Sequence, residues 1–206
     1  MKRFAAIFLA LLLLCASLFG CARGKESPEE PDGNKYEPMK FTAENIGRYI
    51  TLSEYSGLEI TLLEGESKGD AALRHIADGA KILEYPDSQV NYYLAQEKAK
   101  YRYLASESGD GYEELLKLLG VTEESMLEDA RALVKKDLVF YAVVFAEGIQ
   151  VTEAEKVANF DKYVKKYVDD FGYDESYVRE NMTEQIYESM LYDKTAEKLI
   201  TMNSFK

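Results

Sequence analysis

The absence of proline after Pro86 is the feature that most constrains how this chain folds. Residues 87–206 contain no proline, and their glycines fall between segments of helical periodicity, at positions 109, 111, 120, 148 and 172. Proline and glycine destabilise a helix interior more than other residues do, so their restriction to junctions is typical of successive helices. We therefore predict a helical domain over residues 69–206.

The apolar periodicity agrees with this prediction. Between the glycines, apolar residues recur at steps of three and four, as they do on the buried face of a helix. The longest predicted helix, of roughly 25 residues, follows Thr122 and includes the all-apolar stretch "LVFYAVVFA" at 138–146. Thr152 with Glu155 three residues later has the spacing of a capping box. The predicted N-caps are Asp70, Thr122, Thr152 and Asp174.

A shorter stretch before the helices has a different pattern. Residues 48–63, "RYITLSEYSGLEITLL", are rich in β-branched and aromatic residues, and Ser56-Gly57 marks a turn within them. We predict two short strands or extended segments here. Because two strands are not stable alone in water, they must lie on the helical part. The expected fold class is thus mainly α, an elongated helical domain with a short N-terminal pair of β or extended segments.

The N-terminus has the features of an export signal. Lys2 and Arg3 precede an apolar run from Phe4 to Leu14, which is too short to span a membrane comfortably. The following "SLFGC" resembles a lipobox, so we predict that residues 1–20 are a lipoprotein signal peptide and that Cys21 is the lipid attachment site. An ordinary secretory signal with a chance cysteine and an uncleaved anchor helix are the alternatives.

The segment that follows is predicted to be a tether. Three of the four prolines lie within residues 21–40, together with many charged residues and no hydrophobic periodicity. We predict a flexible acidic tether over residues 21–40 and an extended or β connector over residues 41–68. A lipidated Cys21 would place the helical domain on the extracytoplasmic face of a bacterial membrane, anchored in the cell envelope.

Charge and residue types exclude several functions. The chain has 25 basic and 37 acidic residues, a net charge of −12, which argues against binding nucleic acid or an anionic lipid surface. The single histidine, His75, has no neighbouring cysteine or second histidine and is predicted to be a partly exposed structural residue. No phosphate-binding or hydrolase motif is present. We expect no catalytic residue, no metal site and no cofactor.

The order of the segments is similar to part of a known chaperone family. "YITLSEYSGLEIT", "YPDSQVNYYLAQEKAKYRYLAS" and the stretch from "YEELLKLLG" to "EGIQVTEAE" resemble the connector and the C-terminal substrate-binding domain of trigger factor, the ribosome-associated folding chaperone. The resemblance covers roughly residues 48–202. Related helical domains occur in the exported chaperones SurA and PrsA. The resemblance implies helical arms that hold unfolded polypeptides.

Two departures from trigger factor limit this inference. A signal peptide and an acidic tether stand where trigger factor has its ribosome-docking domain, so no ribosome partner is expected. Only "LLEGESKG", residues 62–69, stands where trigger factor has an FKBP-like isomerase domain. Eight residues cannot form that domain, so prolyl isomerase activity is the least favoured function, and we expect the protein not to be an enzyme.

The leading hypothesis is a membrane-tethered, ATP-independent chaperone for unfolded or nascent exported polypeptides. The alternative is an envelope adaptor or assembly lipoprotein that binds one specific folded partner. Aromatic and methionine side chains on helical arms can repack around varied apolar segments, and an acidic surface favours basic clients. Ordinary packing in the helical core is the alternative role for each candidate. The candidate client contacts are Tyr141, Phe145, Phe160, Met182, Tyr187 and Met190.

Overall fold

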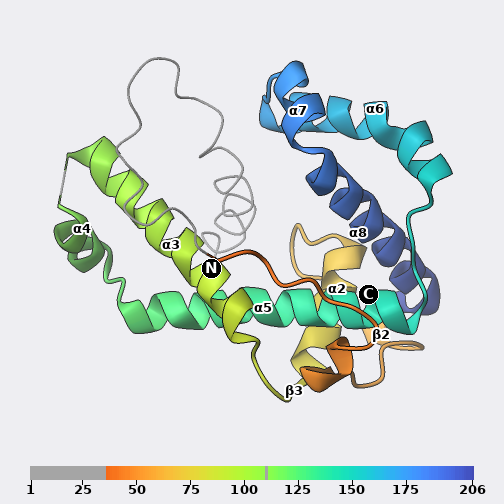
Figure 1. The fold of residues 1–206 in the computed structure, drawn as a ribbon. Helices are drawn as coiled ribbons and strands as arrows, with labels where there is room; N and C mark the ends of the chain where they lie inside the picture. Colours follow the sequence, from red (N-terminus) through yellow and green to blue (C-terminus); the bar gives the residue numbers. More distant parts are fainter. Residues whose placement is uncertain (1–35, 110) are drawn as a thin grey trace. The chain divides into compact units, whose positions relative to one another are not determined.

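The structure, a computed structural model, describes residues 36–109 and 111–206. The described residues form seven α-helices, one 3-10 helix and four two-residue strands, which confirms the predicted mainly α fold (Figure 1). The predicted signal peptide, the lipobox with Cys21, and residues 21–35 of the predicted tether lie outside the described residues. The elements are η1 (Ile46–Arg48), β1 (Ile50–Thr51), β2 (Glu59–Ile60), α2 (Lys68–Gly79), β3 (Lys81–Ile82), α3 (Asp87–Ser108), α4 (Tyr112–Leu119), α5 (Glu123–Ala146), α6 (Glu153–Phe171), α7 (Glu175–Asn181), α8 (Thr183–Met202) and β4 (Ser204–Phe205).

Three of the four predicted N-caps are confirmed. The Thr122 hydroxyl accepts a hydrogen bond from the Ser125 N–H, and the Asp174 carboxylate accepts one from the Tyr177 N–H. Thr152 and Glu155 form the predicted capping box. Each of these side chains satisfies a backbone N–H that has no partner within its own helix.

The predicted Asp70 cap is wrong. α2 begins at Lys68, and its N-cap is Ser67, whose hydroxyl accepts a hydrogen bond from the Asp70 N–H. Asp70 therefore lies in the first turn, where a carboxylate interacts favourably with the positive end of the helix dipole. Its side chain accepts hydrogen bonds from the Ser67 hydroxyl and from the Tyr192 hydroxyl of α8.

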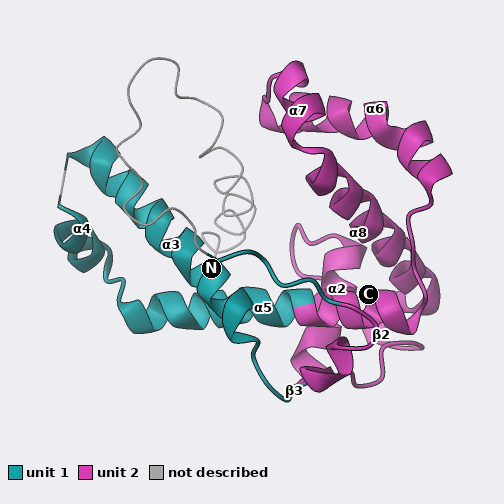
Figure 2. Ribbon diagram, in the orientation of Figure 1, with its two compact units in different colours: residues 1–41, 82–137 teal, residues 42–81, 138–206 magenta. Residues whose placement is uncertain are grey.

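The chain divides into two compact units, shown in Figure 2. Unit 1 comprises residues 1–41 and 82–137, and unit 2 comprises residues 42–81 and 138–206. α5 contributes to both, since unit 1 ends at Asp137 and the last part of unit 2 begins at Leu138. The predicted domain boundaries at residues 20, 40 and 68 stay predictions.

Unit 1 contains a partly buried polar network on α3 and α5. Asp137 accepts hydrogen bonds from the Tyr93 hydroxyl at 2.7 Å and from the Gln89 amide at 2.8 Å. The side-chain oxygen of Gln89 in turn accepts a hydrogen bond from the Met39 backbone N–H. Burial raises the pKa of the Asp137 carboxyl to about 6, although both hydrogen bonds act to lower it. The network thus joins residues before α3 to α3 itself and to α5.

The raised pKa of Asp137 predicts a specific dependence of stability on pH. The folded state holds the Asp137 carboxyl proton more tightly than the unfolded chain does, because the pKa of an Asp in the unfolded chain is about 3.9. The contribution of Asp137 to the free energy of unfolding is therefore largest at pH values below this unfolded pKa. It is lost as the pH rises through about 6. We expect Asp137→Asn to remove this loss. As the pH rises from 4.5 to 7.5, the free energy of unfolding of the variant should increase by roughly 2 kcal/mol relative to that of wild type.

Urea unfolding at several pH values measures this difference. Asp129→Asn, a change of an exposed carboxylate on the same helix, is the matched control and should follow wild type. Parallel pH profiles for wild type and Asp137→Asn would contradict the assignment.

Unit 2 is built on the contact between α2 and α8. Ala71, Ala72 and Ile76 of α2 and Leu199 of α8 have no exposed surface. β2 pairs in parallel with β4, in a register that matches Glu59 with Ser204 and Ile60 with Phe205. Ile60 is fully buried, so the side-chain alternation of this short sheet places one residue of β2 in the core. The two short strands predicted in residues 48–63 are confirmed as β1 and β2.

Within residues 36–109 and 111–206, no helix combines the length and the apolar character that a membrane span requires.

Candidate polypeptide-binding surface

Three helices of unit 2, α6, α7 and α8, together with Met182 at the junction of α7 and α8, contain four of the six predicted contact residues. α6 starts at the Thr152 capping box and ends at Gly172, whose φ of 72° is a left-handed conformation that glycine adopts without strain. Asp174 then caps α7 within two residues, and Met182 is the last residue before α8. These short, well-defined junctions bring the apolar faces of the three helices together; the three helices are called the arm below.

The centre of the arm is a small core of aliphatic, methionine and tyrosine side chains. The fully or nearly fully buried members have exposed fractions between 0% and 7%. α6 contributes two adjacent residues, α7 contributes a single valine, α8 contributes two residues four positions apart, and Met182 lies at the junction between α7 and α8. The members are Tyr163, Val164, Val178, Met182, Ile186 and Met190.

Half-buried aromatic side chains lie over this core. The Phe160 and Tyr187 rings meet edge to face, with centroids 6.4 Å apart, and the Lys156 ammonium lies 4.6 Å from the Tyr187 centroid. Toward the end of α6, Tyr167 contacts the rings of Phe171 and Tyr173. The aromatic side chains packed against the core are Phe160, Tyr167, Tyr173, Tyr177 and Tyr187. Their exposed surface gives the arm apolar area that its own core does not cover.

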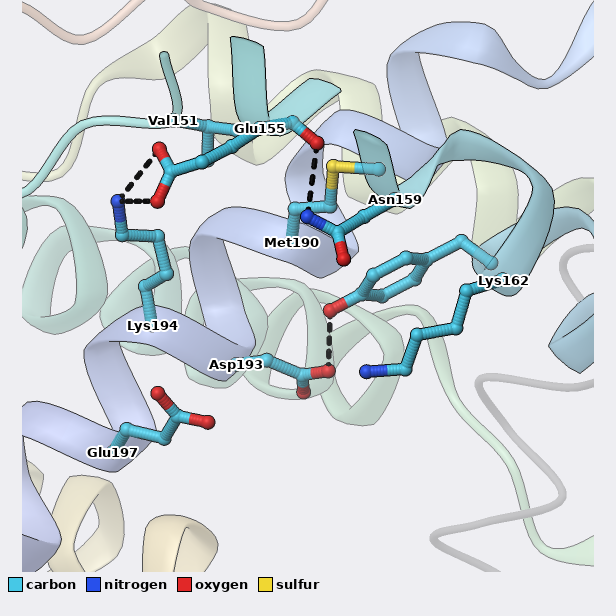
Figure 3. Close-up of a pocket in the computed structure, with 9 residues that line it drawn as sticks. Val151, Glu155, Asn159, Lys162, Met190, Asp193, Lys194 and Glu197 are labelled. Carbon is cyan, nitrogen blue, oxygen red and sulfur yellow. Dashed lines mark hydrogen bonds and ion pairs between the residues drawn. The ribbon is translucent and has the colours of Figure 1, made fainter. Parts of the chain in front are cut away.

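A pocket opens between α6 and α8 beside this core (Figure 3). Its volume is about 190 Å³. Met190 and Tyr163 belong both to the pocket wall and to the buried core, and Val151 adds a third apolar side chain. The remaining lining residues are polar or charged: Glu155, Asn159, Lys162, Asp193, Lys194 and Glu197.

The charged side chains of the pocket are partly paired with one another. Figure 3 shows Lys194 reaching the Glu155 carboxylate, with its ammonium 2.7 Å and 2.9 Å from the two carboxylate oxygens. This bond and those from Thr152 lower the pKa of Glu155 to about 2. The Tyr163 hydroxyl donates to Asp193 at 2.7 Å, and burial together with this bond raises the Tyr163 pKa. The pocket thus combines paired polar side chains with an apolar wall.

The structure brings four of the six predicted contact residues together. Phe160 and Tyr187 are half-buried over the arm core, and Met182 and Met190 are buried within it, at 7% and 4% exposure. Met182 and Met190 therefore pack in the core, and Met190 also reaches the pocket. The role of all six residues in binding stays a prediction.

The other two predicted contact residues, Tyr141 and Phe145, lie on α5 within unit 2. Their rings are stacked, with centroids 6.1 Å apart and an angle of 24° between the planes. Phe140, one residue earlier, stacks on Tyr192 of α8 at 6.0 Å. Sequence spacing alone does not indicate Phe140 or Tyr192, because their contact joins two helices that are far apart in the sequence.

The described residues contain no arrangement suited to metal binding. Within residues 36–109 and 111–206, no group of three or more histidine, cysteine, aspartate or glutamate side chains could hold a metal ion. His75 is exposed on α2, which agrees with its predicted place on the helix surface. The arm and its pocket present apolar and charged side chains.

Among curated proteins, this chain is similar to trigger factors of several bacteria. It is 29% identical to trigger factor of Clostridioides difficile (strain 630) over 169 residues, which cover 77% of this chain and 39% of that protein. It is 25% identical to trigger factor of Enterococcus faecalis over 87% of this chain and 42% of that protein. No protein-family model matches the chain, and no solved structure matches it.

A third relative, trigger factor of Pediococcus pentosaceus, is 27% identical over 85% of this chain and 40% of its own length. The chain thus spans about two fifths of the length of these curated relatives. These matches confirm the resemblance predicted from the short sequence segments. Residues 36–206 therefore contain a helical domain similar to the C-terminal domain of trigger factor.

Proposed function

We propose that this protein is an ATP-independent chaperone that holds non-native polypeptides at the extracytoplasmic face of a bacterial membrane. The observation that carries the proposal is the row of half-buried aromatic rings over the arm core, beside a pocket walled by Met190, Tyr163 and Val151. Such rings offer large apolar contact area at small cost in conformational entropy, and methionine adapts to differently shaped partners. The similarity to trigger factor supports the chaperone part of this proposal.

Holding a client in this way requires no nucleotide. The sequence has no phosphate-binding loop after a strand, and apolar contacts form and break without coupling to hydrolysis. Prolyl isomerisation by an inserted FKBP-like domain is not part of the proposal. β2 ends at Ile60 and α2 begins at Lys68, and the Glu66 N–H donates to the Leu63 carbonyl in the turn between them.

Substitution of two arm residues tests the proposed contact surface. We expect Phe160→Ser/Tyr187→Ser to need roughly tenfold more protein for half-suppression of client aggregation, because removing two aromatic contacts weakens an apolar interface by at least about 1.4 kcal/mol. Light scattering from a chemically unfolded client, diluted into the chain from Gly24 onward, measures the effect. Far-UV circular dichroism confirms that the variant is folded.

The matched control is Leu63→Ser, a change of an apolar side chain that is 57% exposed in unit 2 but lies outside the arm. It should suppress aggregation as well as wild type does. Equal suppression by the Phe160/Tyr187 variant would exclude the arm as the contact surface. Binding of one folded partner, with no effect on unrelated unfolded clients, would support the envelope adaptor instead.

The membrane tether rests on the lipobox, and Cys21 is the residue that tests it. We expect Cys21→Ser to release the protein from the membrane fraction almost completely, since the sequence offers no second apolar anchor after residue 21. Fractionation of cells, with incorporation of a labelled fatty acid as the direct readout, measures this. Cys15→Ser is the control and should leave lipidation unchanged; persistent labelling of the Cys21 variant would contradict the assignment.

A further inference from the structure

Met190 belongs to the buried core of the arm and also lines an open pocket. Its exposed fraction is only 4%, and it shares the arm core with Tyr163 and Ile186. It is nevertheless part of the wall of the pocket between α6 and α8 (Figure 3). The pocket volume of about 190 Å³ is far larger than the roughly 15 Å³ that one water molecule requires. Small polar molecules therefore have a path to the Met190 side chain in the folded protein.

The other methionines of the described residues lie in different surroundings. Met126 of α5 has no exposed surface. Met182 is 7% exposed and belongs to the arm core, but it does not line this pocket. The remaining two are half-buried and lie outside the arm core: Met39 and Met202. Met190 is thus the methionine that connects the arm core to the pocket between α6 and α8.

We propose that Met190 is an oxidation site, at which hydrogen peroxide that enters the pocket converts the thioether to a sulfoxide and loosens the packing of α6 on α8. One oxygen atom passes from the peroxide to the Met190 sulfur. The O–O bond breaks, an S–O bond forms, and the second peroxide oxygen leaves as water. The sulfur is oxidised by two electrons and the peroxide is reduced by two. The inference concerns the arm itself and does not depend on the proposed function.

A sulfoxide is poorly suited to the arm core. Its oxygen is a strong hydrogen-bond acceptor, and the core around it includes the aliphatic side chains of Val164 and Ile186. Burial of this oxygen without a donor would cost free energy. On the pocket side, the Asn159 amide and the Lys162 ammonium are available as donors. We therefore expect the oxidised Met190 side chain to turn into the pocket, which removes its contacts from the arm core.

Polar contacts between α6 and α8 limit the change to a local one. Lys194 bonds to Glu155, and the Tyr163 hydroxyl donates to Asp193. None of these contacts involves the Met190 sulfur, so they remain after oxidation. The contact of α2 with α8 is also separate, because its buried residues lie outside the arm core. Oxidation should therefore loosen the arm while the rest of unit 2 stays folded.

Peptide mapping by mass spectrometry tests the accessibility of the sulfur. The folded chain from Gly24 onward, which retains every described residue, is treated with hydrogen peroxide and sampled over time. We expect Met190 to be oxidised at least about tenfold faster than Met126, the fully buried methionine. In urea-unfolded chain the two rates should be equal. Equal rates in the folded protein would overturn the inference.

Hydrogen exchange of the oxidised protein tests the structural consequence. Amides of α6 and of residues 183–193 should exchange roughly tenfold faster than before oxidation, whereas those of α2 should not change. Met190→Leu removes the sulfur at similar volume and should abolish this response. Met182→Leu is the matched control in the same core and should retain it. Circular dichroism verifies that both variants are folded.

The contrary results differ from one another. Unchanged exchange of the oxidised wild type would show that the sulfoxide does not loosen the arm and would overturn the inference. A response that persists in Met190→Leu and disappears in Met182→Leu would assign the oxidation site to Met182 and overturn it as well. Neither measurement uses a client, so failure of wild type to suppress aggregation would overturn the proposed function alone.

Discussion

Removal of residues 203–206 is expected to lower the free energy of unfolding by about 3 kcal/mol or more. These four residues form β4 and its flanks, and they bond to a segment far away in the sequence. The Asn203 side chain accepts from the Leu58 N–H and donates to the Tyr55 carbonyl. The Ser204 and Lys206 N–H groups donate to Leu58 and Ile60, and the Leu62 N–H donates to Lys206. Each lost bond costs roughly 1 kcal/mol, and water would gain access to Ile60.

Urea unfolding of the truncated chain measures this loss. Lys206→Ala is the matched control, because it keeps the backbone bonds of β4 and removes only an exposed ion pair with Glu59. An exposed pair contributes at most about 1 kcal/mol, so the control should be close to wild type. A truncated chain that unfolds at the wild-type urea concentration would show that β4 does not stabilise unit 2.

Substitution of Gly69 is expected to disrupt the contact between α2 and α8. A Cβ atom at this position would lie 2.6 Å from the Ala196 Cβ, closer than carbon atoms approach in proteins. Gly69→Val should therefore lower the free energy of unfolding by about 3 kcal/mol, because the two helices must separate or shift. Adding Ala196→Gly should recover part of the loss, and a double-mutant cycle would give a coupling of about 1 kcal/mol or more.

Gly47→Val provides a matched control in the same unit. A Cβ at Gly47 meets no heavy atom within 4 Å, so the same substitution should have a small effect. Equal destabilisation by the two changes would show that the loss at Gly69 does not come from the contact with Ala196. That result would contradict the close packing of α2 on α8.

The helices of this protein could largely be predicted from local signals. The predicted helix after Thr122 is observed as α5, with 24 residues, and the Thr152 capping box and Gly172 delimit α6. The cap predicted at Asp70 is wrong because Ser67, three residues earlier, offers an equally good cap, and a pattern in a single sequence does not rank two competing caps. α4 is not predicted as a separate helix, since its eight residues are short for a periodicity argument.

Tertiary pairings could not be predicted, for a physical reason. β4 exists only because Ser204 and Phe205 lie beside Glu59 and Ile60, and two residues have no strand periodicity of their own. Likewise, Lys194 meets Glu155 across 39 residues of sequence because α8 packs on α6. The stripe that contains Met182 and Met190 is visible in the sequence. Which of its members are buried and which reach a pocket depends on helix packing.

The arm of unit 2 combines half-buried rings with a pocket whose charges are partly paired. In the proposed function, these rings would contact the apolar segments of an unfolded client.

The most direct test of the central claim is light scattering from chemically unfolded, aggregation-prone clients diluted into the chain from Gly24 onward, without ATP. At near-stoichiometric ratios we expect suppression of scattering for several unrelated clients. Unchanged scattering for all of them, from protein shown to be folded by circular dichroism, would contradict the chaperone function and favour an adaptor for a single partner.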